Sequence, residues 1–243
     1  MSIKTSFYYS PNFDTQKRKK NNVRFLIFHY TGMRSEKDAL KRLTKIQSEV
    51  SSHYFIKKNG QVFTLVPELY IAWHAGISSW KKLHSLNKYS IGIEIANPGH
   101  EFGYKKFTVK QINSLINLSK FLIKKYKINK KNILGHSDIA PTRKNDPGEK
   151  FPWEYLSKKN IGIWHSLNKK VLIKLRNKKC SDKMKLEFIK NLHKIGYSKK
   201  NQNKLRKSQY NMFLVKAFQR HFRQEIVNGK IDQECSLIAK NLL

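Results

Sequence analysis

The stretch Val23-Arg-Phe-Leu-Ile-Phe-His29 is an almost continuous run of apolar residues, rich in aromatic and branched aliphatic side chains. A strand with one exposed face alternates apolar with polar residues, whereas a strand covered on both faces shows an unbroken apolar run. The stretch therefore predicts a central strand in a sheet that is packed on both faces. This requirement favours an α/β architecture in which helices flank a central sheet.

Other periodic patterns follow along the first two thirds of the chain. Residues 89–97 alternate between isoleucines on one face and small residues around a lone carboxylate, Glu94, on the other, which predicts a second central strand. The other predicted elements are a helix after Ser35, a β-hairpin of residues 53–66 turning at Asn59-Gly60, a helix from Thr108 to Tyr126 that opens with a capping box, a strand of residues 132–136 and a loop of residues 137–152.

The chain divides into three parts. Residues 1–22 are polar and basic, and we expect them to form an arm that wraps the next domain or stays mobile, so that folded structure begins at Val23. Residues 23–170 contain the strand patterns. Residues 171–243 show three helical stripes of apolar residues without strand-like alternation, which predicts a small three-helix domain with a core of its own.

Composition narrows the function classes. The 50 Lys and Arg residues against 16 Asp and Glu give a formal net charge of +34, so the surface attracts polyanions. Lysine far outnumbers arginine and no nucleic-acid-binding motif is present, which makes a non-specific nucleic-acid binder the weakest alternative. No apolar run reaches the length of about 18 residues that a membrane span needs. With only Cys180 and Cys235, a disulfide scaffold and a cysteine zinc cage are excluded.

Three residues with metal-binding side chains stand at strand ends or in a stiffened loop. His29 ends the predicted central strand, His136 ends the next short strand, and Asp146 lies in a proline-rich loop. Two imidazoles and one carboxylate are sufficient to hold a catalytic zinc that keeps a fourth position for water. Each residue alone also has an ordinary structural explanation, as a packed histidine or a turn-forming aspartate. Glu94 is harder to explain structurally, because a carboxylate in an apolar strand is costly to bury without a partner.

A family resemblance rests on five ordered segments within residues 23–165. They are FLIFHYTG, SSHYFIKKNGQVFTLVPE, AWHAGISSW, NKYSIGIEIANPGH and ILGHSDIAPTRKNDPGEKFPWEYL, and together they resemble the zinc-dependent N-acetylmuramoyl-L-alanine amidases, the type 2 amidases related to peptidoglycan recognition proteins. The tail, with AFQRHFR and NGKID, is similar to the C-terminal peptidoglycan-binding-like domain of two-domain Gram-negative amidases. The resemblance implies a central mixed sheet flanked by helices, followed by a small helical domain.

The resemblance also implies roles for individual residues. His29, His136 and Asp146 would bind one Zn²⁺ per chain, Glu94 would take the proton of the attacking water, and Lys144 would face the oxyanion of the scissile carbonyl. The reaction would be hydrolysis of the amide between N-acetylmuramic acid, or its anhydro form, and L-alanine of the stem peptide.

The resemblance further suggests which groups surround the substrate. The small neighbours of Glu94, Gly92 and Ala96, are expected to leave space for a glycopeptide. The side chains considered for substrate contact are Tyr30, Trp73, His74 and Trp80.

The expected partners are peptidoglycan or muropeptides, with no specific nucleic acid and with the chain acting as a monomer. Such a hydrolase belongs in the periplasm or cell envelope, although residues 1–22 show no apolar leader, which favours the cytoplasm if this N-terminus is native. The competing function is a non-catalytic peptidoglycan-binding protein on the same fold. The presence of all three ligands together with Glu94 and Lys144 argues against it.

Overall fold

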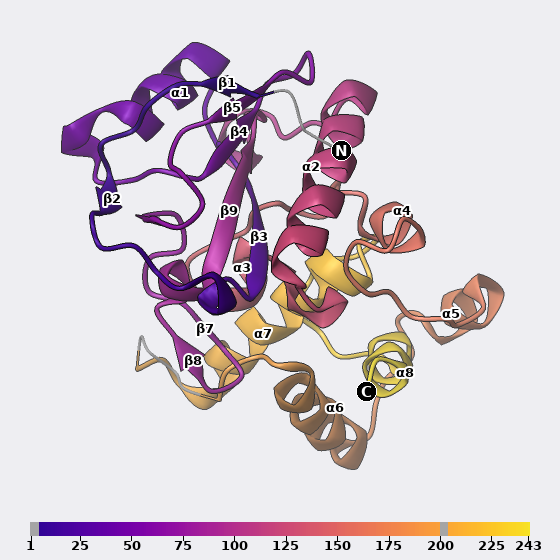
Figure 1. Cartoon of the computed structure of the whole chain (residues 1–243). Helices are drawn as coiled ribbons and strands as arrows, with labels where there is room; N and C mark the ends of the chain where they lie inside the picture. Colours follow the sequence, from indigo (N-terminus) through magenta and orange to yellow (C-terminus); the bar gives the residue numbers. More distant parts are fainter. Residues whose placement is uncertain (1–4, 200–203) are drawn as a thin grey trace.

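The computed structural model describes residues 5–199 and 204–243. At its centre lies a six-stranded sheet with the strand order β1-β5-β4-β9-β3-β10 (Figure 1). Its strands are β1 (Ser6–Phe7), β3 (Phe25–Tyr30), β4 (Tyr54–Ile56), β5 (Val62–Thr64), β9 (Ser90–Ile95) and β10 (Ile133–Gly135). Strands β4, β9, β3 and β10 run parallel, whereas β5 is antiparallel to β4. The sheet is therefore mixed, as predicted.

Helices and short strands surround this sheet. The α-helices are α1 (Glu36–Thr44), α2 (Val109–Tyr126), α3 (His136–Ile139), α4 (Trp153–Lys158), α5 (Lys169–Leu175), α6 (Asp182–Ile195), α7 (Lys207–Phe222) and α8 (Gln233–Asn241). Two small antiparallel pairs are β2 (Phe13–Asp14) with β6 (Ile71–Ala72) and β7 (Ser79–Trp80) with β8 (Leu83–His84). Single 3₁₀ turns are η1 (Lys20–Asn22), η2 (Ile46–Ser48), η3 (Leu86–Tyr89), η4 (His100–Phe102) and η5 (Lys130–Asn132). The predicted loop of residues 137–152 thus contains most of α3.

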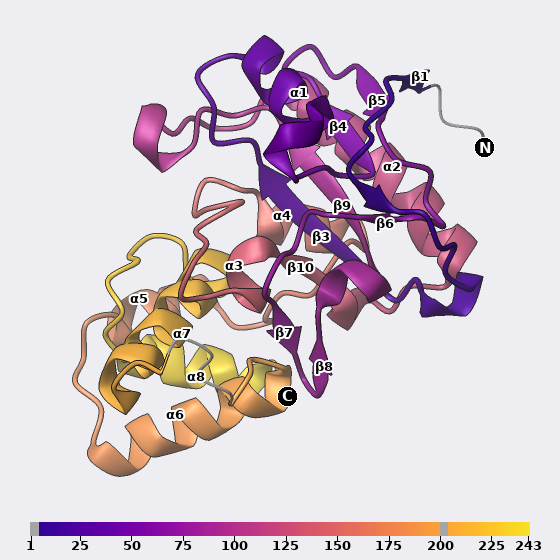
Figure 2. The same cartoon turned by 90° about the vertical axis from the view of Figure 1, so that its left-hand side faces the viewer.

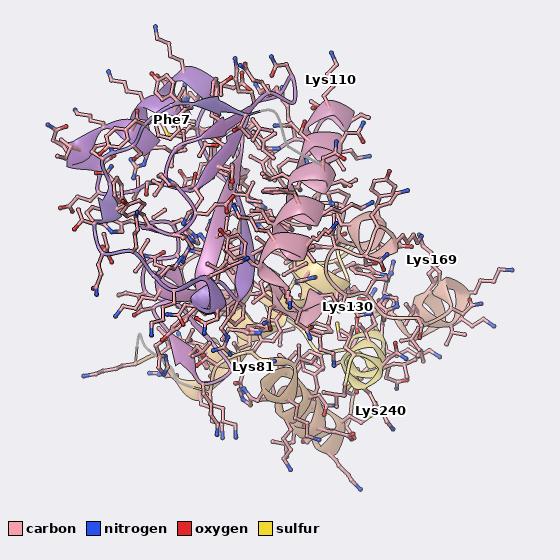
Figure 3. All side chains as sticks on the ribbon, in the orientation of Figure 1. Phe7, Lys81, Lys110, Lys130, Lys169 and Lys240 are labelled. Carbon is pink, nitrogen blue, oxygen red and sulfur yellow. The ribbon has the colours of Figure 1, made fainter. Side chains whose placement is uncertain are left out.

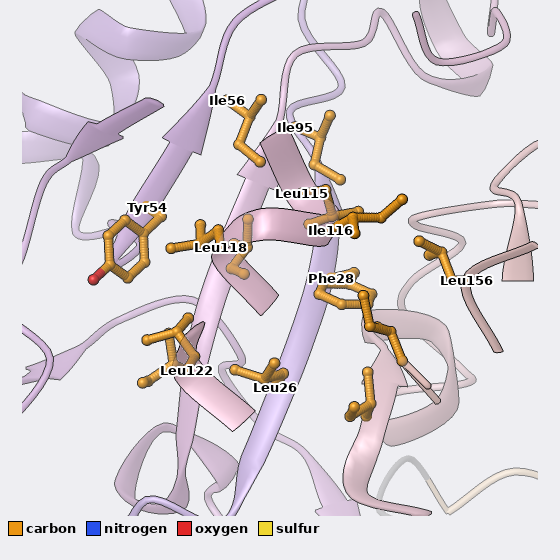
Figure 4. Close-up of a cluster of buried hydrophobic side chains, with 14 of the residues drawn as sticks. Leu26, Phe28, Tyr54, Ile56, Ile95, Leu115, Ile116, Leu118, Leu122 and Leu156 are labelled. Atoms are coloured by element: carbon orange, nitrogen blue, oxygen red, sulfur yellow. The ribbon is translucent and has the colours of Figure 1, made fainter. Parts of the chain in front are cut away.

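The first face of the sheet is covered by α2. This helix begins at the predicted capping box, in which the Thr108 side chain accepts from the Gln111 N–H and the Gln111 side chain accepts from the Thr108 N–H. Its aliphatic stripe packs on side chains of β3 and β9, as Figure 4 shows for Leu115, Phe28 and Ile95. The apolar faces predicted for the two strands and the helix are therefore buried against each other.

The opposite face of β3 and β10 is covered by the C-terminal helices. Phe25 and Ile27 of β3 and Leu134 of β10 share one buried cluster with residues of α6, α7 and α8, among them Phe188 and Phe218. Figure 2 shows α6, α7 and α8 gathered on one side of the sheet, below α3. The predicted tail helices are present, preceded by the short α5, but the expectation that they have a core of their own is wrong. The apolar residues of β3 that point to this face must be buried, and the C-terminal helices bury them.

The segment of residues 5–22 is part of the fold. Strand β1 pairs with β5 at the edge of the central sheet. The buried Arg18 guanidinium donates to the carbonyl oxygens of Glu68 at 2.7 Å and Ser90 at 2.7 Å. The polar composition of this segment predicts an exposed arm. Arg18 can nevertheless be buried, because carbonyl oxygens of loops accept hydrogen bonds from the five N–H donors of a guanidinium. The expectation that folded structure begins at Val23 is therefore corrected.

The positive charge is distributed over the whole surface. The exposed side chains of Lys81, Lys110, Lys130, Lys169 and Lys240 project from different parts of the molecule (Figure 3). This distribution fits a general surface property better than a single anion-binding face. None of the helices in the described part of the chain combines the length and apolar content needed to cross a bilayer.

Because His53 is buried, we expect acid to lower the free energy of unfolding. Its Nδ1 accepts the Gly92 N–H at 3.1 Å, and burial, followed by the charge of Arg18, lowers the pKa of His53 well below its usual value. An unfolded imidazole binds a proton below about pH 6.5, so the free energy of unfolding should fall as the pH drops below that value, by up to about 1.4 kcal/mol per pH unit. Urea unfolding of metal-free protein at about pH 7.5 and about pH 5 measures this loss. A His53→Gln variant should show a smaller loss, and an equal loss would contradict the assignment.

Candidate metal centre

The carboxyl end of two neighbouring parallel strands brings the predicted ligands together. In the pairing of β3 with β10, Gly135 lies opposite Phe28, so the next residues, His29 and His136, reach the same edge of the sheet. His29 Nδ1 lies 2.9 Å from His136 Nδ1, and each of these atoms lies 3.1 Å from Asp146 Oδ2. All three residues are buried, and they form the candidate metal-binding group in the described residues.

The third ligand is tied to the second through the backbone. The Ser137 N–H donates to the Asp146 carbonyl oxygen at 2.8 Å, which fixes the loop of Asp146 against the start of α3. Gly135 is required just before this helix, because a Cβ there would lie 2.6 Å from Pro147 Cδ. The close approach of the two segments explains how residues ten positions apart in the sequence meet at one point.

The outer nitrogens of both imidazoles have buried partners. His136 Nε2 lies 3.1 Å from the Ala75 carbonyl oxygen, and His29 Nε2 lies 3.0 Å from His74 Nδ1. His74 Nε2 in turn lies 3.1 Å from Ser90 Oγ, which donates to the Leu86 carbonyl oxygen at 2.6 Å. If neither Nδ1 atom carries a proton, each Nε2–H donates to its buried partner. The series of hydrogen bonds that starts at His29 then runs through His74 and Ser90 and ends on the Leu86 carbonyl oxygen. The arrangement orients both rings with Nδ1 toward the centre.

His74 lies behind His29 and fills the space that a small strand residue leaves. A Cβ on Gly92 would lie 2.4 Å from the His74 ring. The expectation that Gly92 leaves room for a substrate is therefore corrected, because that room holds the His74 imidazole.

The electrostatics of the cluster favour a neutral His29 imidazole and an ionised Asp146 carboxylate. Burial, followed by the nearby His136, lowers the pKa of His29 to about 4. Burial by itself raises the pKa of the Asp146 carboxyl, but the charge and hydrogen bond of His136, together with those of His29, hold that pKa well below its usual range. Neutral imidazoles with a carboxylate are the protonation states in which these groups can bind a cation.

Glu94 lies next to the cluster on the adjacent strand. In the parallel pairing of β3 with β9, Glu94 is the register partner of His29. Its Oε2 is buried and has no hydrogen-bond partner among the described residues. Burial, followed by the charge of Asp146, raises the pKa of Glu94 well above its usual value, while Lys144 acts in the opposite direction. A raised pKa allows the Glu94 carboxyl to take up and release a proton beside the cluster.

A cleft of about 560 Å³ opens above these groups. Tyr30, Trp73 and Lys144 all contribute to its lining. The Tyr30 hydroxyl lies 2.8 Å from Nδ1 of His100, which also lines the cleft, and the Trp73 indole N–H donates to Asp14 Oδ1 at 2.7 Å. Both rings are therefore held by side-chain partners.

Trp80 does not belong to this cleft. Its side chain is 2% exposed and packs edge-on against Tyr197 in the cluster shared by the sheet and the tail, with ring centroids 4.9 Å apart. The expectation that Trp80 contacts substrate is therefore wrong, because the β7–β8 hairpin turns this residue toward the C-terminal helices.

Sequence reasoning missed Arg143, which also lines the cleft. Its guanidinium donates to the carbonyl oxygens of Ala75 at 3.0 Å and Ile77 at 2.7 Å, joining the loop before Asp146 to the segment that holds His136 Nε2. The one sequence feature that could have indicated its place at the cleft is its position directly before Lys144.

Comparison with known proteins identifies the family. The family profile for N-acetylmuramoyl-L-alanine amidase matches residues 19–149, which is more than half of the chain. The chain belongs to the N-acetylmuramoyl-L-alanine amidase family. The sequence is also 35% identical over 233 residues to the amidase AmiD of Escherichia coli, covering 91% of this chain and 82% of AmiD.

Solved structures of this family share the fold over nearly the whole chain. The complex of E. coli AmiD with anhydro-N-acetylmuramic acid-L-Ala-D-γ-Glu-L-Lys matches with a TM-score of 0.79 and 35% identity, covering 91% of this chain and 89% of that chain. AmpDh3 from Pseudomonas aeruginosa matches with a TM-score of 0.79 and 31% identity, covering 100% of this chain and 97% of that chain. These matches confirm the predicted family, the α/β fold and the amidase class.

Proposed function

We propose that this amidase hydrolyses the bond between the lactyl group of N-acetylmuramic acid, or its anhydro form, and L-alanine of the stem peptide. The observation that carries the proposal is the convergence of His29, His136 and Asp146 beside Glu94 in a chain of this family. Three of these four residues, His136, Asp146 and Glu94, line the cleft. The substrate named for the AmiD complex is an anhydromuramic peptide, and AmpDh3 has been solved with an anhydromuramic pentapeptide. Both support a muropeptide or peptidoglycan substrate.

The three ligands fit one Zn²⁺ ion. Two imidazole nitrogens and one carboxylate oxygen, all buried and within 4.8 Å of one another, are a donor set that zinc accepts while keeping one position open. Bound zinc supplies Lewis acidity and lowers the pKa of a water to about 7.

Glu94 is proposed as the proton-transfer residue. Its carboxyl sits opposite His29 in the strand register, and its Oε2 is free of protein hydrogen bonds in the described residues. It can therefore accept a proton from the attacking water and return it to the amine that leaves. Its raised pKa serves this exchange, because a proton acceptor works best when its pKa approaches the working pH.

Lys144 is proposed to stabilise the negative charge that develops on the carbonyl oxygen. It lines the cleft two residues before Asp146, and its charge acts on both Glu94 and His29. A cation fixed beside the reacting carbonyl stabilises the oxyanion more than the neutral amide, so it lowers the barrier. Tyr30 and Trp73 offer aromatic faces at the cleft for the sugar or peptide.

The rival function is peptidoglycan binding without cleavage. The buried Oε2 of Glu94, which has no hydrogen-bond partner in the described part of the chain, is costly to retain beside three metal ligands for binding alone, which favours hydrolysis. Intact peptidoglycan lies in the periplasm and cell envelope, which supports that location, whereas soluble muropeptide fragments would also be met in the cytoplasm.

Product analysis tests the proposed reaction. Zinc-loaded protein should convert an anhydro-N-acetylmuramyl peptide into the free anhydro sugar acid and a peptide with N-terminal L-alanine, identified by mass spectrometry. Chelator-treated protein should be inactive until zinc is restored, because the three ligands hold the ion that activates water. Incubation with intact sacculi in parallel shows which of the two substrates is preferred. An intact muropeptide, or a cut at another bond, would refute the proposal.

A further inference from the structure

The buried carboxylate of Asp138 joins the ligand-bearing helix α3 to the C-terminal helices. Asp138 lies two residues after His136 and is 1% exposed. Its Oδ2 accepts the Gly135 N–H at 2.8 Å, which caps the N-terminus of this four-residue helix. A helix this short is not stable through its own hydrogen bonds. The orientation of α3, and with it that of His136, therefore depends on side-chain contacts.

The tail supplies two of these contacts. The Tyr197 hydroxyl, which follows α6, donates to Asp138 Oδ1 at 2.7 Å, and His221 Nδ1 of α7 lies 2.8 Å from Asp138 Oδ2. Both side chains are buried, at 1% and 2% exposure. Figures 1 and 2 both show α7 beside α3. A buried carboxylate needs hydrogen-bond donors, and here residues 59 and 83 positions away provide them.

His221 also supports the segment that carries the third ligand. Its ring stacks on Trp153, with centroids 3.8 Å apart and planes 16° from parallel. Trp153 in turn packs close to Gly135, where a Cβ would lie 3.3 Å from Trp153 Cζ2 and 2.6 Å from Pro147 Cδ. Pro147 directly follows Asp146. His221 thus supports the segment of His136 through Asp138 and the segment of Asp146 through Trp153.

We propose that Tyr197 and His221 are positioning residues for the metal centre, which hold α3 in the orientation that lets His136 bind zinc. The inference rests on the zinc role proposed above. It makes the C-terminal helices a structural part of the metal centre, in addition to any part they have in holding polymer. Metal binding depends on ligand geometry, and the loss of an outer hydrogen bond typically weakens it by about 10- to 100-fold.

Tyr197→Phe tests the proposal, because it removes one hydroxyl and keeps the ring. Zinc affinity, measured by competition with a chromophoric chelator, should fall about 10-fold, and the visible spectrum of the Co²⁺-substituted protein should change as the ligand geometry loosens. The matched control is Tyr210→Phe, which removes a buried hydroxyl that donates to the Ser198 carbonyl oxygen within the tail. Its zinc affinity should stay within about twofold of the parent value.

The outcomes separate positioning from general stability. If both variants lose stability to urea but only Tyr197→Phe loses zinc affinity, the positioning role is supported. If zinc affinity and the Co²⁺ spectrum match the parent in Tyr197→Phe, or change equally in both variants, the inference is refuted. A parent chain that takes up no zinc would refute the proposed function itself.

His221 provides a second, independent variant pair. His221→Asn keeps an N–H donor near the position of Nδ1, whereas His221→Leu removes it. The asparagine variant should retain more zinc affinity than the leucine variant. Equal loss in the two would show that the hydrogen bond to Asp138 does not position the ligand.

Discussion

Replacing Glu94 with glutamine is expected to slow turnover by at least about 100-fold while leaving the zinc content nearly unchanged. Glutamine has the same size but cannot accept the proton of the attacking water. Zinc should remain because Glu94 is not among the three converging ligands. Single-turnover cleavage of an anhydromuramyl peptide, with zinc measured by atomic emission on the same samples, gives both quantities.

The control for this variant is Glu101→Gln, which changes an exposed carboxyl at the same cleft. Its turnover should resemble that of the parent, because Glu101 does not pair with a ligand-bearing strand as Glu94 does. Zinc loss from Glu94→Gln would make Glu94 a support of the metal site. Near-normal cleavage by this variant would remove Glu94 from the proton-transfer step.

The sequence marked the candidate ligands through local features, and the family resemblance assigned them to one metal site. The apolar run that ends at His29 and the short strand before His136 are both visible as patterns, and parallel pairing of β3 with β10 then brings the two histidines to one edge. The alternation around Glu94 likewise predicted a carboxyl on the face opposite the three isoleucines, and in the structure those isoleucines belong to the core that α2 covers. The family resemblance supplied the roles of these residues, and it also singled out Lys144, which no periodic pattern marks.

Contacts between distant segments could not be predicted in the same way. Trp80 lies in one of the segments that carry the family resemblance and was considered for substrate contact, yet it packs against Tyr197, which lies more than a hundred residues further along the chain. Gly92 leaves space for the His74 ring, and Arg18 is buried among loop carbonyls. These placements depend on which segments dock together, and local composition does not encode that.

The boundary between catalytic part and tail illustrates the same limit. Apolar stripes predict helices but not their partners, and the tail stripes pack on Phe25, Ile27 and Leu134 as well as on each other. The apolar residues on both faces of β3 predict that each face is buried by another element, and the tail helices bury the second face. The use of residues 171–243 as a peptidoglycan-binding domain stays a prediction.

Replacing His136 with alanine is expected to abolish both zinc retention and cleavage. Two remaining ligands are fewer than the three protein ligands that a catalytic zinc site uses, so the ion should be lost on dialysis. His84→Ala is the matched control, because His84 is exposed on β8 and away from the cluster.

The most direct test of the whole account is the zinc content of the purified chain, measured beside that of His136→Ala and His84→Ala. The proposed zinc site requires one zinc per chain in the parent and in His84→Ala, and almost none in His136→Ala, with cleavage of the muramyl–L-alanine bond following the zinc content. A parent chain that cleaves this bond without zinc, or a His136→Ala variant that keeps both zinc and activity, would contradict it.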